Sequence, residues 1–267
     1  MKQRVISAAV GIVLLVIVLS LYDTPVLTAA LACITAIAVY EVLVSTHYLP
    51  TKSGGVLCAL FAGASVFMIQ HGEALYLPAV VLFVAVLIGC ALKFHRQFSF
   101  QQLTVCVFTA TAIPLAFSTI LMMDGIIYLI LTCIAAWVTD MGAFFVGRAF
   151  GKRKLAPEIS PYKTVEGAIG GLACAGIIFP AVCYGYWHFS HLGAGLSLSH
   201  AVLIGVVCAV TGMMGDLFAS VIKRQTGIKD FGKIMPGHGG VMDRFDSFLF
   251  VAPTLYFLSR LFPIFTI

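Results

Sequence analysis

The segment KIMPGHGGVMDRFDSFLF, residues 233–250, joins a basic, glycine-rich stretch to two aspartates at the start of an apolar run. Glycines allow backbone amides to approach an anion closely, and the N-terminal end of the helix expected next attracts negative charge. Carboxylates together with phosphate oxygens are typical ligands of Mg²⁺. The segment therefore predicts a site for a phosphate group and a hard cation. The candidate residues of this site and its approach are Lys229, Lys233, His238, Gly239, Gly240, Asp243, Arg244 and Asp246.

The two aspartates also have a purely structural interpretation. Asp243 and Asp246 are about one helical turn apart, so a continuous helix would turn both toward the same site. Alternatively, Asp243 caps the helix and Asp246 pairs with Arg244. His238 by itself is equally compatible with a loop histidine whose hydrogen bonds are local.

A second polar group lies in GDLFASVIKR, residues 215–224. The helical repeat places its polar side chains on one face: Asp216, Ser220, Lys223 and Arg224. An ionisable group inside a membrane is costly and usually lines a polar cavity, which favours a functional role for Asp216. The structural alternative is that a neighbouring helix neutralises Asp216, while Lys223 and Arg224 mark the membrane edge.

A third group lies upstream, in DMGAFFVGRAFG (residues 140–151) and SPYKTVEG (residues 160–167). Asp140 is a second carboxylate within an apolar run, and it shares a helical strip with Phe144 and Arg148. Two glycines on that strip, Gly147 and Gly151, suit close packing of helices. Thr164 is a candidate N-cap of the next helix, a role that can coexist with ligand contacts.

These groups must be positioned by membrane helices. Of the 267 residues, 61% are hydrophobic and 10% are charged, and the mean hydropathy is +1.05. So little polar surface excludes a water-soluble globule, and we expect an all-α, polytopic integral membrane protein. Apolar runs near the roughly 20 residues that span a bilayer predict nine helices, at 5–22, 25–44, 54–70, 74–93, 103–123, 125–147, 168–189, 200–222 and 245–265.

The basic residues indicate the orientation. With nine helices, fifteen of the sixteen Lys and Arg residues fall on one side, and only Arg260 does not. By the positive-inside rule the amino terminus and the loops at 148–166 and 223–244 are cytosolic, and the carboxy terminus is on the opposite side. The net charge of +5 is thus explained mostly by the basic residues that set the orientation in the membrane. It also attracts anionic lipid or nucleotide. We expect no nucleic-acid partner.

The polar groups divide the chain near residue 124. Residues 1–123 form chemically quiet amino-terminal helices, whose interior acid Glu41 either pairs or caps locally or has a direct role. Residues 124–267 form the region with both long loops, and the two parts can also be one integrated membrane domain. The first apolar run follows Lys2 and Arg4 without a cleavage region and is expected to be a retained anchor. Eight cysteines without a CxxC pair indicate ordinary buried thiols.

The run SVIKRQTGIKDFGKIMPGHGGVMDRFD, residues 220–246, resembles the signature of the phosphatidate cytidylyltransferase family, also called CDP-diacylglycerol synthases. DMGAFFVGRAFGK and SPYKTVEG resemble upstream motifs of that family, so the specific resemblance covers residues 140–246. Two positions depart from the pattern. Met235 stands where other aliphatic residues or phenylalanine are expected, and Tyr162 stands where lysine or asparagine is common. The tyrosine weakens one expected anion contact.

The resemblance implies that CTP and phosphatidate react to CDP-diacylglycerol and pyrophosphate, in phospholipid biosynthesis at a bacterial cytoplasmic (inner) membrane. It implies Mg²⁺, and a second cation in some arrangements, held by Asp216, Asp243 and Asp246. It also implies a homodimer, and small residues such as Gly167 and Gly171 permit close helix contacts. The implied catalytic residues are Asp140, Asp216, Asp243, Asp246, Lys223 and Arg224. The implied substrate-binding residues are Ser160, Lys163, Thr164, Glu166, Ser220, Lys229, His238, Gly239, Gly240 and Arg244.

Two other classes of membrane protein are alternatives. Interior Asp140 and Asp216 also suit an ion relay in a cation-coupled transporter, which would move ions without consuming CTP. A CDP-alcohol phosphotransferase is another multipass lipid enzyme with clustered aspartates. Its DGxxAR start is absent, because Asp124 and Gly125 are followed by Ile, Ile, Tyr and Leu.

Overall fold

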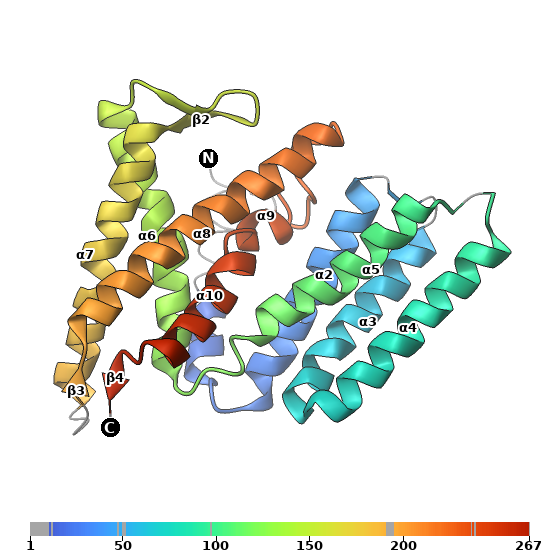
Figure 1. Cartoon of the computed structure of the whole chain (residues 1–267), viewed down its shortest axis with the longest axis horizontal. Helices are drawn as coiled ribbons and strands as arrows, with labels where there is room; N and C mark the ends of the chain where they lie inside the picture. The colour runs from blue at the N-terminus through green and yellow to red at the C-terminus, as the bar shows by residue number, and fades with distance from the viewer. Residues whose placement is uncertain are drawn as a thin grey trace. The chain divides into compact units, whose positions relative to one another are not determined.

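The chain folds into long apolar helices, as Figure 1 shows. The computed structural model describes residues 11, 13–46, 48–49, 52–96, 98–190, 195–235, 237 and 239–266. Within these residues, seven helices are long and apolar enough to cross a membrane. They are α2 (Pro25–Ser45), α3 (Lys52–His71), α4 (Glu73–Lys93), α5 (Phe100–Ser118), α6 (Ile126–Phe150), α7 (Val165–Ser190) and α8 (Leu198–Gln225). The predicted class, a helical polytopic membrane protein, is confirmed.

The predicted number of nine spanning helices is approximate. The first predicted run, 5–22, lies partly outside the described residues, although 13–20 are helical. The last predicted run, 245–265, is not one long helix. It contains the end of α9 (Met242–Phe245) and all of α10 (Phe248–Leu261). The 14 residues of α10 are fewer than the roughly 17 that a spanning helix needs.

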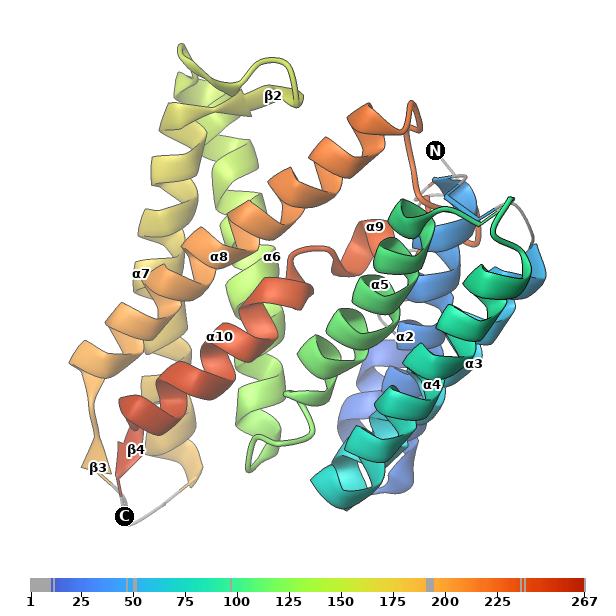
Figure 2. The same cartoon turned by 45° about the vertical axis from the view of Figure 1, so that its right-hand side comes forward.

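Residues 1–121 and 223–245 form one compact unit, in which α2, α3, α4 and α5 lie side by side (Figure 2). Local sequence sets where two of these helices begin. Thr24 caps α2, since its hydroxyl accepts the Val26 amide at 3.3 Å and Pro25 follows it. Ser99 and Gln102 form a capping box at the start of α5. The core of the unit is apolar and includes the fully buried side chains Val39, Val66 and Phe117.

Residues 122–222 and 246–267 form the other unit, built from α6, α7, α10 and most of α8. The segment predicted as a long loop, 148–166, contains an antiparallel hairpin of β1 (Lys154–Ala156) and β2 (Ser160–Thr164). It stands at one end of α6 and α7 in Figure 1. A second short pair, β3 (Gly195–Leu196) and β4 (Phe265–Thr266), joins the connection after α7 to the end of the chain. The all-α prediction therefore omitted two short antiparallel strand pairs, the β1–β2 hairpin and the β3–β4 pair.

Glycines bring α6 and α7 into close contact. A Cβ atom added at Gly167 would lie 2.6 Å from the Ala143 carbonyl oxygen, and one added at Gly171 would lie 2.7 Å from that of Thr139. The same test at Gly147 places the added atom 2.9 Å from the Thr164 hydroxyl oxygen and 3.4 Å from the Gly167 Cα, in agreement with the predicted packing role of Gly147. Gly167 and Gly171 therefore serve contacts within the chain.

We expect Gly171→Ala to destabilise the protein, because the added methyl group would overlap a backbone oxygen that cannot turn away. The cost of such overpacking is about 1–3 kcal/mol, which thermal unfolding in a mild detergent measures as a lower Tm. Gly185→Ala, in the same helix, is the matched control, since nothing lies within 4 Å of its added Cβ. Equal melting temperatures for the two variants would contradict the packing argument.

Candidate active site

A cavity of about 420 Å³ lies among α6, the β1–β2 hairpin, α7 and α8. Apolar side chains such as Phe144 and Met213 form part of its wall. The polar side chains that line it are Asp140, Arg148, Tyr162, Lys163, Thr164 and Asp216. Four of these, all except Arg148 and Tyr162, belong to the residues predicted to form the site. The structure thus brings together predicted residues from three separate sequence motifs.

Lys163 and Asp216 form an ion pair in this cavity. Their side chains are 26% and 27% exposed, but the Lys163 ammonium nitrogen itself is buried, and no further hydrogen-bond partner is assigned to it among the described residues. An ammonium group carries three donors, so Lys163 retains capacity for an anion beside the carboxylate. Arg148 adds a second positive charge to the wall. The cavity therefore offers two cations to a phosphate-bearing ligand.

The segment leading into α7 is held by local hydrogen bonds. The Gly167 amide donates to the Thr164 hydroxyl at 3.1 Å, which confirms Thr164 as the N-cap of α7. Glu166 accepts the Lys152 and Arg153 amides at 3.0 and 3.1 Å, and the Arg153 Nε also at 3.1 Å. Glu166 thus ties the start of the hairpin to α7. Its predicted substrate contact stays a prediction.

The hairpin also presents an exposed tyrosine beside the cavity. Tyr162 is 91% exposed while it lines the wall. The residue that departs from the expected lysine or asparagine therefore lies at this cavity. Ser160, on the same strand, is half-buried.

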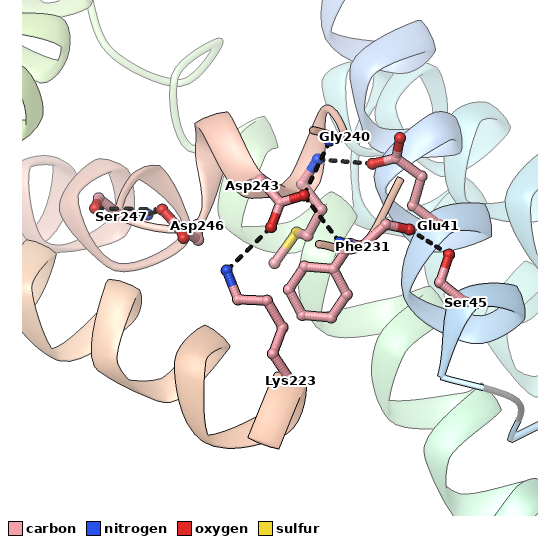
Figure 3. Close-up of polar contacts among 9 residues, drawn as sticks. Glu41, Ser45, Lys223, Phe231, Gly240, Asp243, Asp246 and Ser247 are labelled. Carbon is pink, nitrogen blue, oxygen red and sulfur yellow. Dashed lines mark hydrogen bonds and ion pairs between the residues drawn. The ribbon is translucent and has the colours of Figure 1, made fainter. Parts of the chain in front are cut away.

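A second polar cluster surrounds Asp243 in the other unit, as Figure 3 shows. The Asp243 side chain is 3% exposed, and its Oδ1 lies 3.0 Å from the Lys223 ammonium. Its Oδ2 accepts the Phe231 and Gly240 amides, each at 2.9 Å. The Gly240 amide thus donates to this carboxylate, and the phosphate contact expected for it stays a prediction. Gly239 has a φ of +85°, which glycine adopts without strain.

Asp243 and Asp246 do not lie on one continuous helix, which their expected placement one helical turn apart requires. Helix α9 ends at Phe245, and Asp246 lies in the turn before α10. The Ser247 amide donates to the Asp246 carboxylate at 2.8 Å. In a continuous helix the same amide would donate to a backbone carbonyl. Asp246 itself is 8% exposed.

The remaining candidates are distributed over both units. Ser220 is half-buried on α8, while Arg224, Lys229 and Arg244 are exposed. His238 lies outside the described residues. Within the described part of the chain, no group of three or more His, Cys, Asp or Glu side chains is arranged to hold a metal ion.

Sequence reasoning left two residues without a defined place in a site. Arg148 lines the cavity, and its position on the Asp140 strip was the signal for it. Glu41 is 3% exposed, and its Oε2 accepts the Met242 amide at 2.9 Å. The sequence marked Glu41 only as an acid within an apolar run.

Comparison with known proteins extends along almost the whole chain. Residues 2–262 match the Cytidylyltransferase family. The phosphatidate cytidylyltransferase of Bacillus subtilis (strain 168) is 34% identical over 274 residues, which cover 98% of each chain. The phosphatidate cytidylyltransferase of Staphylococcus haemolyticus (strain JCSC1435) is 31% identical, over 97% of this chain and 98% of the relative.

We expect Asp243→Asn to destabilise the segment after α8, because it leaves the Lys223 ammonium buried without a counter-ion. Removing one partner of a buried ion pair costs about 3–5 kcal/mol, whereas removing both charges is far less costly. The double variant Lys223→Met/Asp243→Asn should therefore recover most of the lost stability. Thermal unfolding and the rate of tryptic cleavage at Lys229 and Lys233 measure this. A double variant no more stable than Asp243→Asn would show that the ion pair is not what holds the segment.

Proposed function

Because this chain belongs to the cytidylyltransferase family over nearly its whole length, we propose that it transfers the cytidylyl group of CTP to phosphatidate, forming CDP-diacylglycerol and pyrophosphate. The observation that carries the proposal is the end-to-end similarity to proteins named phosphatidate cytidylyltransferase. The cavity with Lys163, Arg148 and Asp216 supports it, since both substrates bring phosphate groups. The diacyl tails would remain between helices in the bilayer.

The reaction needs no nucleophile from the protein. A phosphate oxygen of phosphatidate attacks the α-phosphorus of CTP, so a new P–O bond forms. The bond from the α-phosphorus to the oxygen that bridges it to the β-phosphorus breaks, and pyrophosphate leaves with that electron pair. Such reactions are accelerated chiefly by positioning and by charge stabilisation. Lys163 and Arg148 are suited to both tasks because they place positive charge on one cavity wall.

We propose that the reaction depends on Mg²⁺ or a similar hard cation. The donor set of the cavity fits such an ion, because Asp140 and Asp216 both line it and carboxylates combine readily with phosphate oxygens around Mg²⁺. Asp216 would hold the ion, and the metal-binding roles expected for Asp243 and Asp246 stay predictions. Asp243 would have to share its carboxylate with Lys223. A bound cation would neutralise charge on the phosphate oxygens.

The alternative, a cation-coupled transporter, has no support from the relatives, whose names describe nucleotidyl transfer. The interior acids that suggested a relay have another explanation. Asp216 is paired with Lys163, and the two cations that line the same cavity, Lys163 and Arg148, suit an enzyme whose substrates carry phosphate groups.

The assay follows directly from the proposed reaction. Purified protein given CTP, phosphatidate and Mg²⁺ should release pyrophosphate and form CDP-diacylglycerol, and omission of any one component should stop both. Lys163→Met should lower kcat/KM about 100-fold, the size of effect seen when a charge-stabilising donor is lost. Lys152→Met, on the same hairpin connection but outside the cavity lining, is the matched control. Full turnover without CTP, or without a divalent cation, would refute the corresponding part of the proposal.

We propose that both segments, 148–166 and 223–244, face the cytosol, where CTP is available. The one-sided distribution of basic residues supports this orientation. Cysteines introduced at Lys154 and Lys233, in a background without accessible native cysteines, should react with a membrane-impermeant reagent only from the cytosolic side. Labelling of the two positions from opposite sides would contradict the orientation.

We also propose that the protein is a homodimer, as the family resemblance implies. Because Gly167 and Gly171 pack against α6 within the chain, the interface would involve other residues. The particle mass in a mild detergent measures the number of copies.

A further inference from the structure

Glu41 is a buried acid of α2 whose carboxylate contacts a segment 201 positions away in the chain. Glu41 is 3% exposed, and its Oε2 accepts a hydrogen bond from the Met242 amide at 2.9 Å. Burial of a carboxylate is costly, and a neutral side chain would pack in an apolar bundle at lower cost. The contact with Met242 therefore suggests a role for Glu41 in the segment that precedes α9.

Ser45 lies one helical turn further along α2 and contacts the same segment. Its hydroxyl donates to the Phe231 carbonyl oxygen. Residues four apart on a helix share a face, so one face of α2 binds the segment at both of its ends, at Phe231 and at Met242. Figure 3 shows Glu41 and Ser45 on that face. We call the described residues of this stretch, 231–235, 237 and 239–242, the α2-bound segment.

Two glycines of the α2-bound segment lie directly against the Glu41 carboxylate. A Cβ atom added at Gly232 or at Gly240 would overlap the Glu41 carboxylate. The other carboxylate oxygen, Oε1, has no hydrogen-bond partner in the described part of the chain and faces these glycines. Glu41 therefore shapes the segment in two ways, as the acceptor for Met242 and as the surface on which Gly232 and Gly240 rest.

The same segment is held from its other side by Asp243. Gly240 is shared between the two acids, since its Cα faces Glu41 while its amide donates to Asp243. Phe231 is likewise shared, because its carbonyl accepts from Ser45 and its amide donates to Asp243. Any shift of the segment away from α2 would therefore move the donors that fix the Asp243 carboxylate.

We infer that Glu41, assisted by Ser45, is a positioning residue: it holds the α2-bound segment, and through it Asp243, in the arrangement that cytidylyl transfer uses. The inference rests on the proposed function for its catalytic part and on the contacts alone for its structural part. It gives the amino-terminal helices a definite task in a reaction whose other candidate residues all lie after residue 139.

The test compares Glu41→Ala with Glu41→Gln, using Thr35→Ala as the matched control. Thr35 is a fully buried polar residue of α2 and makes no hydrogen bond to the segment within the described part of the chain. Glu41→Ala should lower kcat about 10–100-fold, the scale on which small misplacements act, and should speed hydrogen exchange across residues 229–245. Glu41→Gln keeps an acceptor of the same shape, so activity and protection should return to within about threefold of wild type. Thr35→Ala should change neither.

A double-mutant cycle tests the contact with the glycine. Gly240→Ala alone should lower activity and protection, because its methyl group overlaps Glu41. In the Glu41→Ala background the same change should add little, since the overlapping group is gone. Full additivity of the two losses would overturn the inference. If Glu41→Ala does not fold, Glu41→Gln and Ser45→Ala supply the comparison: Ser45→Ala should speed exchange in 229–245, whereas Glu41→Gln should not.

The outcomes separate the inference from the proposed function. A wild-type protein inactive with CTP and phosphatidate would defeat the proposed function, while hydrogen exchange would still decide whether Glu41 holds the segment. Unchanged exchange in Glu41→Ala would overturn the inference even in an active enzyme. Glu41→Gln that is protected but as inactive as Glu41→Ala would also overturn it, because the negative charge would then act directly in the reaction.

Discussion

Acids that lie within apolar helices or are buried at their ends constrain the rest of this structure. Removing a charge from water costs several kcal/mol unless donors surround it. Each such acid therefore needs a cation or hydrogen-bond donors beside it. Asp216 recruits Lys163 from the β1–β2 hairpin. Glu41 recruits the Met242 amide, and Asp243 recruits Lys223 and two backbone amides. The partners come from other elements of the fold, so the connecting segments are placed by the same contacts that make burial of the acids tolerable.

The parts of the fold that could be predicted are those that short sequence ranges determine. Apolar runs near the length of a bilayer crossing predicted α2 to α8, because a spanning helix satisfies its own backbone hydrogen bonds. Thr164 was identified as an N-cap because a cap depends only on the residues that follow it. Asp140 and Asp216 were selected as acids within apolar runs, and Lys163 and Thr164 were selected in the motif SPYKTVEG. All four line one cavity.

What could not be predicted depends on distant partners or on competition between nearby groups. Nothing near Glu41 in the sequence indicates that its carboxylate would accept a hydrogen bond from the distant Met242 amide. The interruption after α9 depends on a local choice, in which the Asp246 carboxylate takes the Ser247 amide. The β1–β2 hairpin was read as a loop because its strands are only three and five residues long. Its attachment through Glu166 is a tertiary contact.

The pairing of Lys163 with Asp216 makes the two ligands of the cavity depend on each other. A phosphate that binds Lys163 competes for the counter-ion of Asp216, and a cation that binds Asp216 competes for the counter-ion of Lys163. Either ligand alone leaves one half-buried charge less well compensated, whereas both together restore the balance. Anion and cation should therefore bind with positive cooperativity, and by thermodynamic reciprocity each should raise the affinity for the other by the same factor. Because the cavity already contains this ion pair, it would bind the anion alone or the cation alone more weakly than it binds the two together.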